Sequence, residues 1–523
     1  MSKKRTKRKP TYKQMAFETA VRNPERYIDI LTSIKDFENR ILDNDCLLEI
    51  VSSLYLNGIV GSELIEISET TKYDDIKEKV EEVNSTRRAD GGFPNGYASR
   101  FWTYMRTPSE LGFVYARYNE PFKISVIAKQ LIERKIDEQQ AFSIQAIKHN
   151  RKNPYRNVSN DFNFFRFILK TLLELRKKGS SLSYEQFIVA MFSENGNVKE
   201  FIAILKNNKF KDFNSAFNFV KKHYNVTTNE RTATKDYPDV VRRVFIISGF
   251  ISIRYSGKKL IQINENKLNY IEKLLEFDFS LTEEEKENSL KYFTKLDTKN
   301  GELLSLLDEF KEEDLIDGNE YVNKIFDIIK TYEIDENIIT QSIERIGTRK
   351  TTIIDEFQEI PEPLKLEFFI SILIALKYGN EFSIRPNYKA DHIGKPYSHA
   401  PGNKGDIEIF SKEIYWLIEV TLIRNKTQQL NHETANVIRH LYSNDEFSDR
   451  LNKYLSFIAP VVHSDTKRFF DVSVVMEKSD NYDVNIKPYS LPEFVEVTQV
   501  KENFNDMKNY TQSVFDSFRN NLN

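Results

Sequence analysis

The 523-residue sequence predicts a multi-domain protein, with a mainly α-helical N-terminal part and an α/β domain at the C-terminal end. The N-terminal prediction rests on a helix-to-hairpin pattern that occurs twice, with copies 137 residues apart. The C-terminal prediction rests on two strongly apolar runs with hairpin spacing, which follow a long apolar helical stretch. Domain boundaries are expected to give four regions: residues 1–150, 151–280, 281–350 and 351–523.

Composition excludes several classes of protein. A single cysteine, Cys46, excludes an internal disulfide framework and a zinc site built from several cysteines, and a reducing, cytoplasmic compartment is expected. The basic N-terminus lacks the apolar core of a signal peptide. The longest apolar run, Phe368–Leu376, is far shorter than the ~20 residues of a membrane span. Because the net charge is only −2, local charge rather than total charge must attract a charged partner.

The first residues predict helices and a basic loop. Helical patterns are expected from Tyr12 to about Lys35 and from Asp43 to Asn57. A glycine-rich loop at residues 85–96 follows and contains two arginines. It lacks the residue order of a GxxxxGK[ST] phosphate-binding loop and has no strand before it, which argues against a nucleotide site.

The repeated pattern begins with a helical stretch, Arg100–Leu111, which is closed by Gly112. A short strand, a turn and a second strand follow, and another helix starts near Val126. In the second copy, Gly249 closes the helical stretch and a hairpin again follows. Both copies share Gly-Phe, an apolar residue, and Arg-Tyr five positions after the glycine, aligned without a gap. This match favours an internal duplication over a chance pair of helix-to-hairpin joints.

A helix, a glycine, and a hairpin with a tight turn form the end of a winged-helix unit. The glycine would take a left-handed conformation, and the hairpin would form the wing. Helix-turn-helix relatives place a helix in the major groove of DNA and use flanking basic residues on the backbone. Each basic side chain could equally be a solvated surface charge. The candidate DNA contacts are Arg87, Arg88, Arg100, Arg106, Arg117, Arg242, Arg243, Arg254, Lys258 and Lys259.

An acidic helical segment separates the repeat from the C-terminal domain. Between Asp308 and Glu336 the chain has eleven Asp and Glu residues against three lysines. Such a segment repels DNA, so residues 281–350 are interpreted as a linker between two working parts. An ordinary solvated helical face is equally consistent with the pattern.

The two apolar runs of the C-terminal domain are Gly405–Phe410 and Tyr415–Leu422. Asp406 lies at the start of the first predicted strand, and Glu419 lies inside the second. A carboxylate in so apolar a strand is costly to bury unless a cation or hydrogen-bond donors compensate it. Two carboxylates at one end of a hairpin can bind a divalent metal ion. Taken singly, each could instead be a turn residue or the polar face of a half-exposed strand.

Two predicted helices flank this hairpin, and each carries an acid. Glu367 lies on the helix Pro363–Leu376, and Glu433 lies on the helix Gln428–Tyr442 together with His440. Helix, loop, hairpin and helix are the layout of the PD-(D/E)XK nuclease core. The sheet is expected to continue at residues 454–462 and 470–475, whereas residues 487–523 show no clear pattern.

Several short motifs of this region resemble the cleavage domain of the AlwI-type restriction endonucleases, which are Type IIS enzymes, and of their nicking relatives. The matching residues are His399–Asn403, Asp406–Ile407, Glu419–Leu422, Glu433 and Arg439–His440. The resemblance implies that Glu367, Asp406, Glu419 and Glu433 form an acidic site with His440 close by. It also places Thr421 where the nuclease motif has a lysine, and this leaves the role of the lysine unassigned.

The expected function is therefore a Mg²⁺-dependent endonuclease that recognises an asymmetric site in double-stranded DNA and cuts at a short distance. Asp406, Glu419 and Glu367 are the expected metal ligands. Glu433 is expected to orient water or metal, and His440 to be a base, a phosphate contact or a packed histidine. One acidic site cuts one strand, so a nicking enzyme remains an alternative, as does a need for a transient homodimer or a small partner subunit. A non-catalytic DNA-binding protein with a nuclease-like fold is the alternative of another class.

Overall fold

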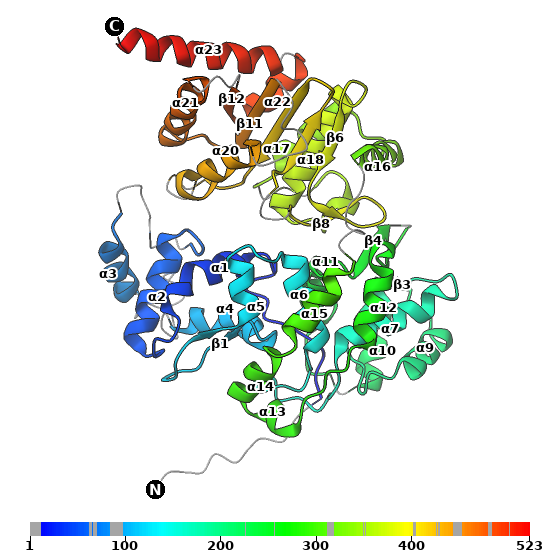
Figure 1. The fold of residues 1–523 in the computed structure, drawn as a ribbon. Coiled ribbons are helices and arrows are strands. Elements are labelled where there is room, and N and C mark those ends of the chain that lie inside the picture. The colour runs from blue at the N-terminus through cyan, green and yellow to red at the C-terminus, as the bar shows by residue number, and fades with distance from the viewer. Residues whose placement is uncertain are drawn as a thin grey trace. The chain divides into compact units, whose positions relative to one another are not determined.

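The computed structural model of the protein forms two compact units, Met1–Glu313 and Asp314–Asn523, and each is described by itself (Figure 1). Within the described residues, no helix is both long and apolar enough to cross a membrane. The structure describes residues 12–61, 65, 71–83, 98–224, 226–255, 257–310, 318–348, 350, 352–400, 404–424, 426, 429–442, 452–479, 484–501 and 503–522. The glycine-rich loop with Arg87 and Arg88 lies outside these ranges.

The first copy of the repeat contains four helices followed by a short antiparallel hairpin. Two further helices, α5 and α6, complete this part of the first unit. The elements are α1 Arg26–Ile34, α2 Asn44–Leu56, α3 Tyr73–Val83, α4 Ala98–Glu110, β1 Val114–Tyr115, β2 Lys123–Ile124, α5 Val126–Ile132 and α6 Glu138–Lys148.

The second copy also has helices followed by a hairpin, but among the described residues five α-helices, not four, precede its hairpin. It adds a short strand, β3, which pairs with β5 to make a three-stranded sheet in the order β3-β5-β4. The elements are α7 Phe164–Arg176, β3 Leu182–Ser183, α8 Tyr184–Ala190, α9 Val198–Asn207, α10 Phe213–His223, α11 Tyr237–Ile247, β4 Ile251–Tyr255, β5 Lys259–Ile263 and α12 Leu268–Glu276.

The glycines that end α4 and α11 adopt the predicted left-handed conformation. Gly112 has φ +74°, and Gly249 has φ +68°. The gap-free alignment nevertheless ends at the hairpin turns. The carbonyl of Phe113 accepts a hydrogen bond from Ser125, whereas the carbonyl of Phe250 accepts one from Asn264. The second hairpin is therefore two residues longer than the first, and its strands are correspondingly longer.

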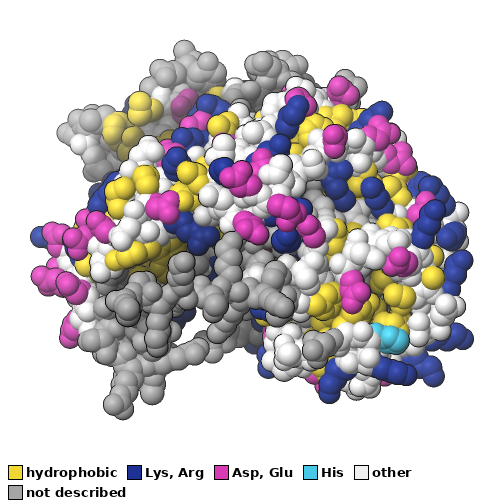
Figure 2. Space-filling view, turned by 90° about the horizontal axis from the view of Figure 1, so that it is seen from below, with side chains coloured by type: hydrophobic (Ala, Val, Ile, Leu, Met, Phe, Trp, Pro, Cys, Tyr) yellow, Lys and Arg dark blue, Asp and Glu magenta, His cyan; other side chains and the backbone are white. Residues whose placement is uncertain are grey.

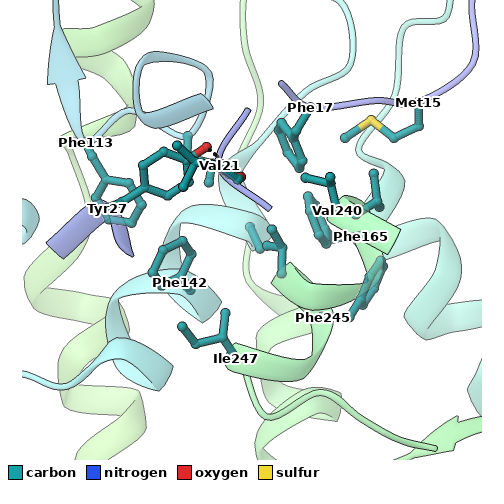
Figure 3. Packing of buried hydrophobic residues seen from close by; sticks show 14 of the residues in the cluster. Met15, Phe17, Val21, Tyr27, Phe113, Phe142, Phe165, Val240, Phe245 and Ile247 are labelled. Carbon is teal, nitrogen blue, oxygen red and sulfur yellow. Dashed lines mark hydrogen bonds between the residues drawn. The ribbon is translucent and has the colours of Figure 1, made fainter. Parts of the chain in front are cut away.

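One hydrophobic core runs through both copies of the repeat. Figure 3 shows Phe165 of α7 between Phe17 and Phe245 of α11, and the ring centroids of Phe165 and Phe245 are 4.7 Å apart, with the two rings tilted against each other. The predicted subdomains 1–150 and 151–280 thus share their interior. The N-terminal contribution comes partly from an extended segment and partly from α1, whereas the sequence predicts a helix for the whole stretch from Tyr12 to about Lys35.

This correction has a physical cause. In residues 12–25 the chain is not helical, and the consecutive residues 14–17, which include Met15 and Phe17, are all buried, while the backbone bonds to distant segments. The amide of Met15 donates to the carbonyl of Met191 at 2.9 Å, and the side-chain amide of Gln14 donates to the carbonyl of Ala233 at 2.9 Å. Burial against the core overrides the helical pattern, and only α1 remains helical.

The acidic segment is helical, as expected, but its helices are divided between the two units. In the first unit, α14 packs through Tyr292, whose hydroxyl donates to the carbonyl of Glu110 at 2.8 Å. The helices of this segment are α13 Glu283–Glu287, α14 Ser289–Leu296 and α15 Asn300–Asp308 in the first unit, and α16 Gly318–Thr331 and α17 Glu336–Arg345 in the second.

The second unit is built on a five-stranded mixed sheet with the order β12-β11-β10-β9-β6. Strands β6, β9 and β10 are antiparallel neighbours, whereas β10, β11 and β12 run parallel. A separate small hairpin is formed by β7 and β8. The elements are α18 Glu362–Tyr378, β6 Ser383–Pro386, β7 Lys389–Ala390, β8 Pro396–Ser398, β9 Ile407–Phe410, β10 Ile414–Val420, α20 Thr434–Tyr442, β11 Asn452–Ala459, α21 Ser464–Ser479, β12 Val484–Ser490, α22 Leu491–Gln499 and α23 Asn503–Leu522.

Side chains alternate between the two faces of β10. Trp416 and Ile418 pack in the cluster that contains α18, while Tyr415 and Leu417 pack in the cluster that contains α20 and α21. The predicted strand at residues 470–475 is wrong, because these residues belong to α21. Phe470 and Val474 lie one helical turn apart and are buried, and Val472 between them is 52% exposed.

Candidate active site

The predicted hairpin is present as β9 and β10, and it places Asp406 beside the end of β10. Asp406 immediately precedes β9, and its Oδ2 accepts a hydrogen bond of 2.8 Å from the backbone amide of Val420. Gly405 allows this approach, because a Cβ atom there would lie 2.3 Å from the Leu417 side chain and 2.7 Å from Oε1 of Glu419. The chain must therefore have glycine at this position to bring the two acids together.

Glu419 is buried in β10 on the face covered by α20. Its Oε1 lies 2.8 Å from Nδ1 of His440, which α20 supplies. The histidine predicted to lie close to the site therefore contacts one of the two hairpin acids directly. Packing of Leu441 and Val437 in the cluster beneath α20 fixes the helix that carries it.

Glu367 reaches the site from α18 and is also buried, with 4% of its surface exposed. Its Oε1 lies 2.5 Å from Nδ1 of His399, which follows β8. Its other oxygen, Oε2, is buried and has no hydrogen-bond partner among the described residues. A buried carboxylate oxygen without a donor is costly, and a cation would compensate it.

Glu433 ends the π-helical turn Gln429–Glu433, which leads into α20. Gln429 anchors this turn, because its side-chain Nε2 donates to the carbonyl of Val461 at 2.9 Å and its side-chain Oε1 accepts from the backbone amide of His463 at 3.2 Å. The anchor joins the turn to the segment just after β11. The half-buried Glu433 is thereby held near the hairpin acids.

The four acids act on each other electrostatically. Burial raises the pKa of Asp406 well above its usual range, and the charges of Glu419, Glu367 and Glu433 raise it further, against the hydrogen bond from Val420. Burial also raises the pKa of Glu419, with Glu433 and Glu367 adding to the effect. Such a cluster is stable as carboxylates only where positive charge is supplied.

The donor set fits a hard divalent cation, which prefers carboxylate oxygens. Asp406, Glu419 and Glu367 can offer these oxygens, and the free oxygen of Glu367 is available for one. Over the described part of the chain, no three acidic, histidine or cysteine side chains are already spaced to enclose a metal ion.

The predicted DNA contacts fall into two groups. Arg100 on α4 and Arg254 and Lys258 on the second hairpin are exposed. Others make internal contacts: Arg106 pairs with Glu18 at 3.2 Å, and Arg117 donates to Ser289 at 3.0 Å. Lys259 on β5 is half-buried.

Two predicted contacts on α11, Arg242 and Arg243, are engaged within the first unit. Arg242 is only 4% exposed, donates to Asp239 at 2.7 Å and lies over the ring of Tyr184. Arg243 is half-buried and binds Asp239 and Asn23. Arg242 is therefore part of the interior of the first unit.

Sequence reasoning missed two parts of the site. His399 lies within the loop that resembles the AlwI-type domain, but its pairing with Glu367, 32 residues away, follows only from the fold. Beneath the hairpin, Arg385 of β6 binds the buried Glu408 at 2.7 Å, and Tyr415 donates to the same carboxylate at 3.1 Å. The available sequence signal for this interaction was a basic residue in one short apolar strand, Arg385, and an acidic residue in another, Glu408.

Comparison with known proteins gives a family match and several distant structural likenesses, two of which are described here. Among curated proteins, no sequence matches this chain. The small subunit (R.BspD6I2) of the heterodimeric restriction endonuclease R.BspD6I is 18% identical, over 34% of this chain and 88% of that one, with a TM-score of 0.26. The BpuJ1 endonuclease binding domain, solved in complex with pyrene- and phenanthrene-modified DNA, is 13% identical, over 56% of this chain and 97% of that one, with a TM-score of 0.32.

Neither likeness is close enough to assign a fold. The family match is much more extensive, since the family model described as AlwI restriction endonuclease matches residues 109–497. That range includes the second copy of the repeat, all four acids and both histidines of the site. The chain belongs to the AlwI restriction endonuclease family.

Proposed function

We propose that this restriction endonuclease works as a Type IIS enzyme, in which the first unit binds an asymmetric duplex site and the second unit hydrolyses a phosphodiester bond a short distance away. Membership of the family makes the chain a site-specific deoxyribonuclease. One observation supports the assignment of cleavage to the second unit. The four acids, Glu367, Asp406, Glu419 and Glu433, converge within that unit alone.

The first unit is proposed to recognise DNA through two winged-helix-like copies. In both copies the middle helix is capped by a short polar side chain, Asp43 on α2 and Ser183 on α8. In both, the residues just before this helix bridge to the hairpin: Ile41 pairs with Pro121, and β3 pairs with β5. Apart from the helices inserted after the capped helix, both copies have the order of helix, bridge, capped helix, glycine-ended helix and wing, and this supports the duplication.

The second unit is proposed to have a PD-(D/E)XK-like core. Its order of helix α18, three antiparallel strands, helix α20 and parallel strand β11 supports this assignment. Thr421 at the motif's lysine position is buried, and its hydroxyl accepts a hydrogen bond of 3.2 Å from the amide of Ile423. We therefore infer a structural role for Thr421 in shaping the chain after β10.

Asp406, Glu419 and Glu367 are proposed to bind Mg²⁺. When bound, the ion would neutralise charge that develops on the phosphate and lower the pKa of a water molecule. The chain itself supplies the orientation: His399 holds one oxygen of Glu367, and His440 holds one oxygen of Glu419. Glu433, at the edge of the acidic cluster, is proposed to orient the attacking water.

Plasmid cleavage tests this proposal. Asp406→Ala and Glu419→Ala are each expected to lower the cleavage rate with Mg²⁺ by at least about 10³-fold, because each removes a charge from the site of phosphate chemistry. DNA binding in the presence of EDTA is expected to stay within about twofold of the parent. Either variant cutting supercoiled plasmid at the parent rate would show that the acids of the second unit are not the catalytic site.

The form of the product answers a second question. One acidic site cuts one strand, so open-circular product alone would indicate a nicking enzyme. Linear product whose rate rises with protein concentration would indicate a transient homodimer. Linear product that requires an added second polypeptide would indicate a partner subunit.

A further inference from the structure

The helices α9 and α10 form a lobe that is covered with lysine side chains. We call this the lysine lobe, and all its basic side chains are exposed. Figure 2 shows Lys and Arg side chains gathered on the side of the view where α9 and α10 lie in Figure 1. The members of the lysine lobe are Lys199, Lys206, Lys209, Lys211, Lys221 and Lys222.

The acidic side chains of this lobe accept hydrogen bonds from other residues of the same region. Asp212 caps α10 by accepting a hydrogen bond of 2.8 Å from the amide of Ser215, and Glu200 accepts hydrogen bonds from the side chains of Asn195 and Asn197. By contrast, Lys206, Lys209, Lys211 and Lys222 form no ion pair with any residue in the described ranges. The lobe therefore presents positive charge that the protein itself does not neutralise.

The first copy of the repeat has the opposite charge at the corresponding place. In both copies the inserted helices lie between the capped middle helix and the helix that ends in the left-handed glycine. In the first copy this insert contains α3, which carries Asp74, Asp75, Glu78, Glu81 and Glu82 against only two lysines. The two inserts have diverged in sign, so the positive charge belongs to the second copy and not to the shared fold.

The lysine lobe is connected to the second hairpin. The Nζ atom of Lys258, in the turn between β4 and β5, donates a hydrogen bond of 3.3 Å to the carbonyl of Phe210 in the loop between α9 and α10. Arg254 at the end of β4 is exposed as well. The hairpin turn and the lobe thus form one continuous basic surface within the first unit.

We propose that this surface binds the phosphate backbone of duplex DNA without regard to sequence. Lysines suit this role, because an ammonium group is a flexible point charge that contacts phosphate from many directions. The proposal rests on the DNA-binding role given above for the first unit. It adds that the second copy supplies the salt-dependent part of the affinity.

The test compares two full-length variants with the same change in net charge. The first is the quadruple variant Lys206→Gln, Lys209→Gln, Lys211→Gln and Lys222→Gln. The control is Lys35→Gln, Lys135→Gln, Lys291→Gln and Lys299→Gln, four exposed lysines of the first unit of which the last three already pair with Glu133, Glu284 and Glu302. Binding to a fluorescent 30-base-pair duplex of random sequence is measured in EDTA from about 50 to 300 mM KCl.

Each lost phosphate contact reduces the slope of log affinity against log salt by about 0.9. We expect the lobe variant to lose roughly 2 to 3.5 units of slope and at least about tenfold in affinity at the lowest salt, and the control to lose less than one unit. Circular dichroism and the thermal midpoint report whether both variants are folded. Equal slopes for two folded variants would overturn the proposal.

Cleavage of plasmid distinguishes this proposal from the proposed function. The lobe variant is expected to cut at the same positions as the parent, mapped by run-off sequencing, although more protein is needed. A change in the cut positions would mean that the lobe reads sequence, contrary to the proposal. A parent protein that neither binds duplex DNA in a salt-dependent way nor cuts it would instead contradict the proposed function itself.

Discussion

The hydroxyl of Thr421 bonds to the backbone two residues later, whereas Glu433 contributes charge to the acidic cluster. Glu433→Gln is therefore expected to lower the single-turnover cleavage rate by about 10²–10⁴-fold, the range for loss of a general base. Thr421→Ala is expected to change the rate by less than about fivefold, because it removes only one local hydrogen bond. Rapid-quench cleavage at saturating Mg²⁺ measures both rates.

Thr421→Ser is the matched control, since it keeps the hydroxyl and removes only a methyl group. It should cleave at the parent rate. A collapse of activity in Thr421→Ala together with a near-parent rate in Glu433→Gln would assign the chemistry to the threonine. Thr421→Lys is expected to impair cleavage, because its ammonium would enter a pocket already arranged around other charges.

Lys148 at the end of α6 makes the stability of the first unit depend on pH. Its Nζ is buried and donates to Asn300 at 2.7 Å and to the carbonyls of Leu296 and Thr298. Burial lowers the pKa of Lys148 to about 7, although Asp297 opposes this. In the unfolded chain the amine stays charged up to a pKa of about 10.4. Between these two pKa values, folding therefore releases a proton. The destabilisation caused by burying the charged amine is largest below pH 7 and decreases as the pH rises.

Lys148→Met is expected to remove this dependence. The free energy of unfolding of the parent minus that of the variant should rise by roughly 2–3 kcal/mol between pH 6.5 and pH 9. Urea titrations at both pH values measure it, with the exposed Lys135→Met as the control. A difference that stays constant or falls with pH would mean that Lys148 is charged in the folded protein throughout.

Among the secondary-structure elements, two left-handed glycines allow the stability cost of backbone strain to be distinguished from the cost of overpacking. A Cβ atom on Gly112 would lie 2.7 Å from the side chain of Leu296, whereas one on Gly257 would meet nothing within 4 Å. Both residues have positive φ. Gly257→Ala is therefore expected to cost about 1 kcal/mol from backbone strain alone. Gly112→Ala is expected to cost about 2–4 kcal/mol, since overpacking adds to the strain.

The two tryptophans allow this comparison within the intact chain. Trp102 lies in the first unit and Trp416 in the second. In a Trp416→Phe background, the fluorescence of Trp102 reports urea unfolding of the first unit only. Equal costs for Gly112→Ala and Gly257→Ala would show that Leu296 moves aside without penalty.

Elements whose apolar pattern is local were predictable from sequence. The two runs around Asp406 and Glu419 form the β9–β10 hairpin, and the repeated glycines end α4 and α11 as expected. In each case one or two neighbouring residues determine the conformation. The presence of Glu367 and Glu433 near the hairpin acids also matches the resemblance.

Elements that depend on distant partners could not be predicted. The run at residues 470–475 has the composition of a strand, and only the cluster beneath α21 selects the helix. Strand β6 joins the sheet through β9, with Arg385 compensating the buried Glu408. The exposure of Arg242 could not be judged either, because its burial depends on Tyr184 in another helix.

For the whole molecule, the boundary between units predicts which fragment retains DNA binding. Residues 1–313 form a compact unit with its own core, so this fragment is expected to fold and to bind the target site within about tenfold of the parent. It should not cut, because all four acids lie beyond it. Gel-shift assays with a duplex carrying the mapped site, against a scrambled duplex, measure the preference.

Residues 314–523 serve as the matched fragment in the same assay. Site preference that appears only in fragments containing these residues would contradict the division of labour. The sequence alone placed the start of the cleavage domain at residue 351, whereas α16 and α17 already belong to the second unit. A fragment beginning at residue 351 lacks the side chains of Ile325 and Ile343 from its core and should be insoluble.

The extended segment near the N-terminus determines when the first unit can be completed during synthesis. Gln14, Met15 and Arg22 bind residues that follow them by roughly 180 to 220 positions. Translation proceeds at about 5–20 residues per second, so this segment must wait on the order of ten seconds or more for its partners to leave the ribosome. The part of the chain that is made first therefore takes its native place late. Until then the side chains of Met15 and Phe17 stay exposed, and chaperones that bind apolar segments would bind there.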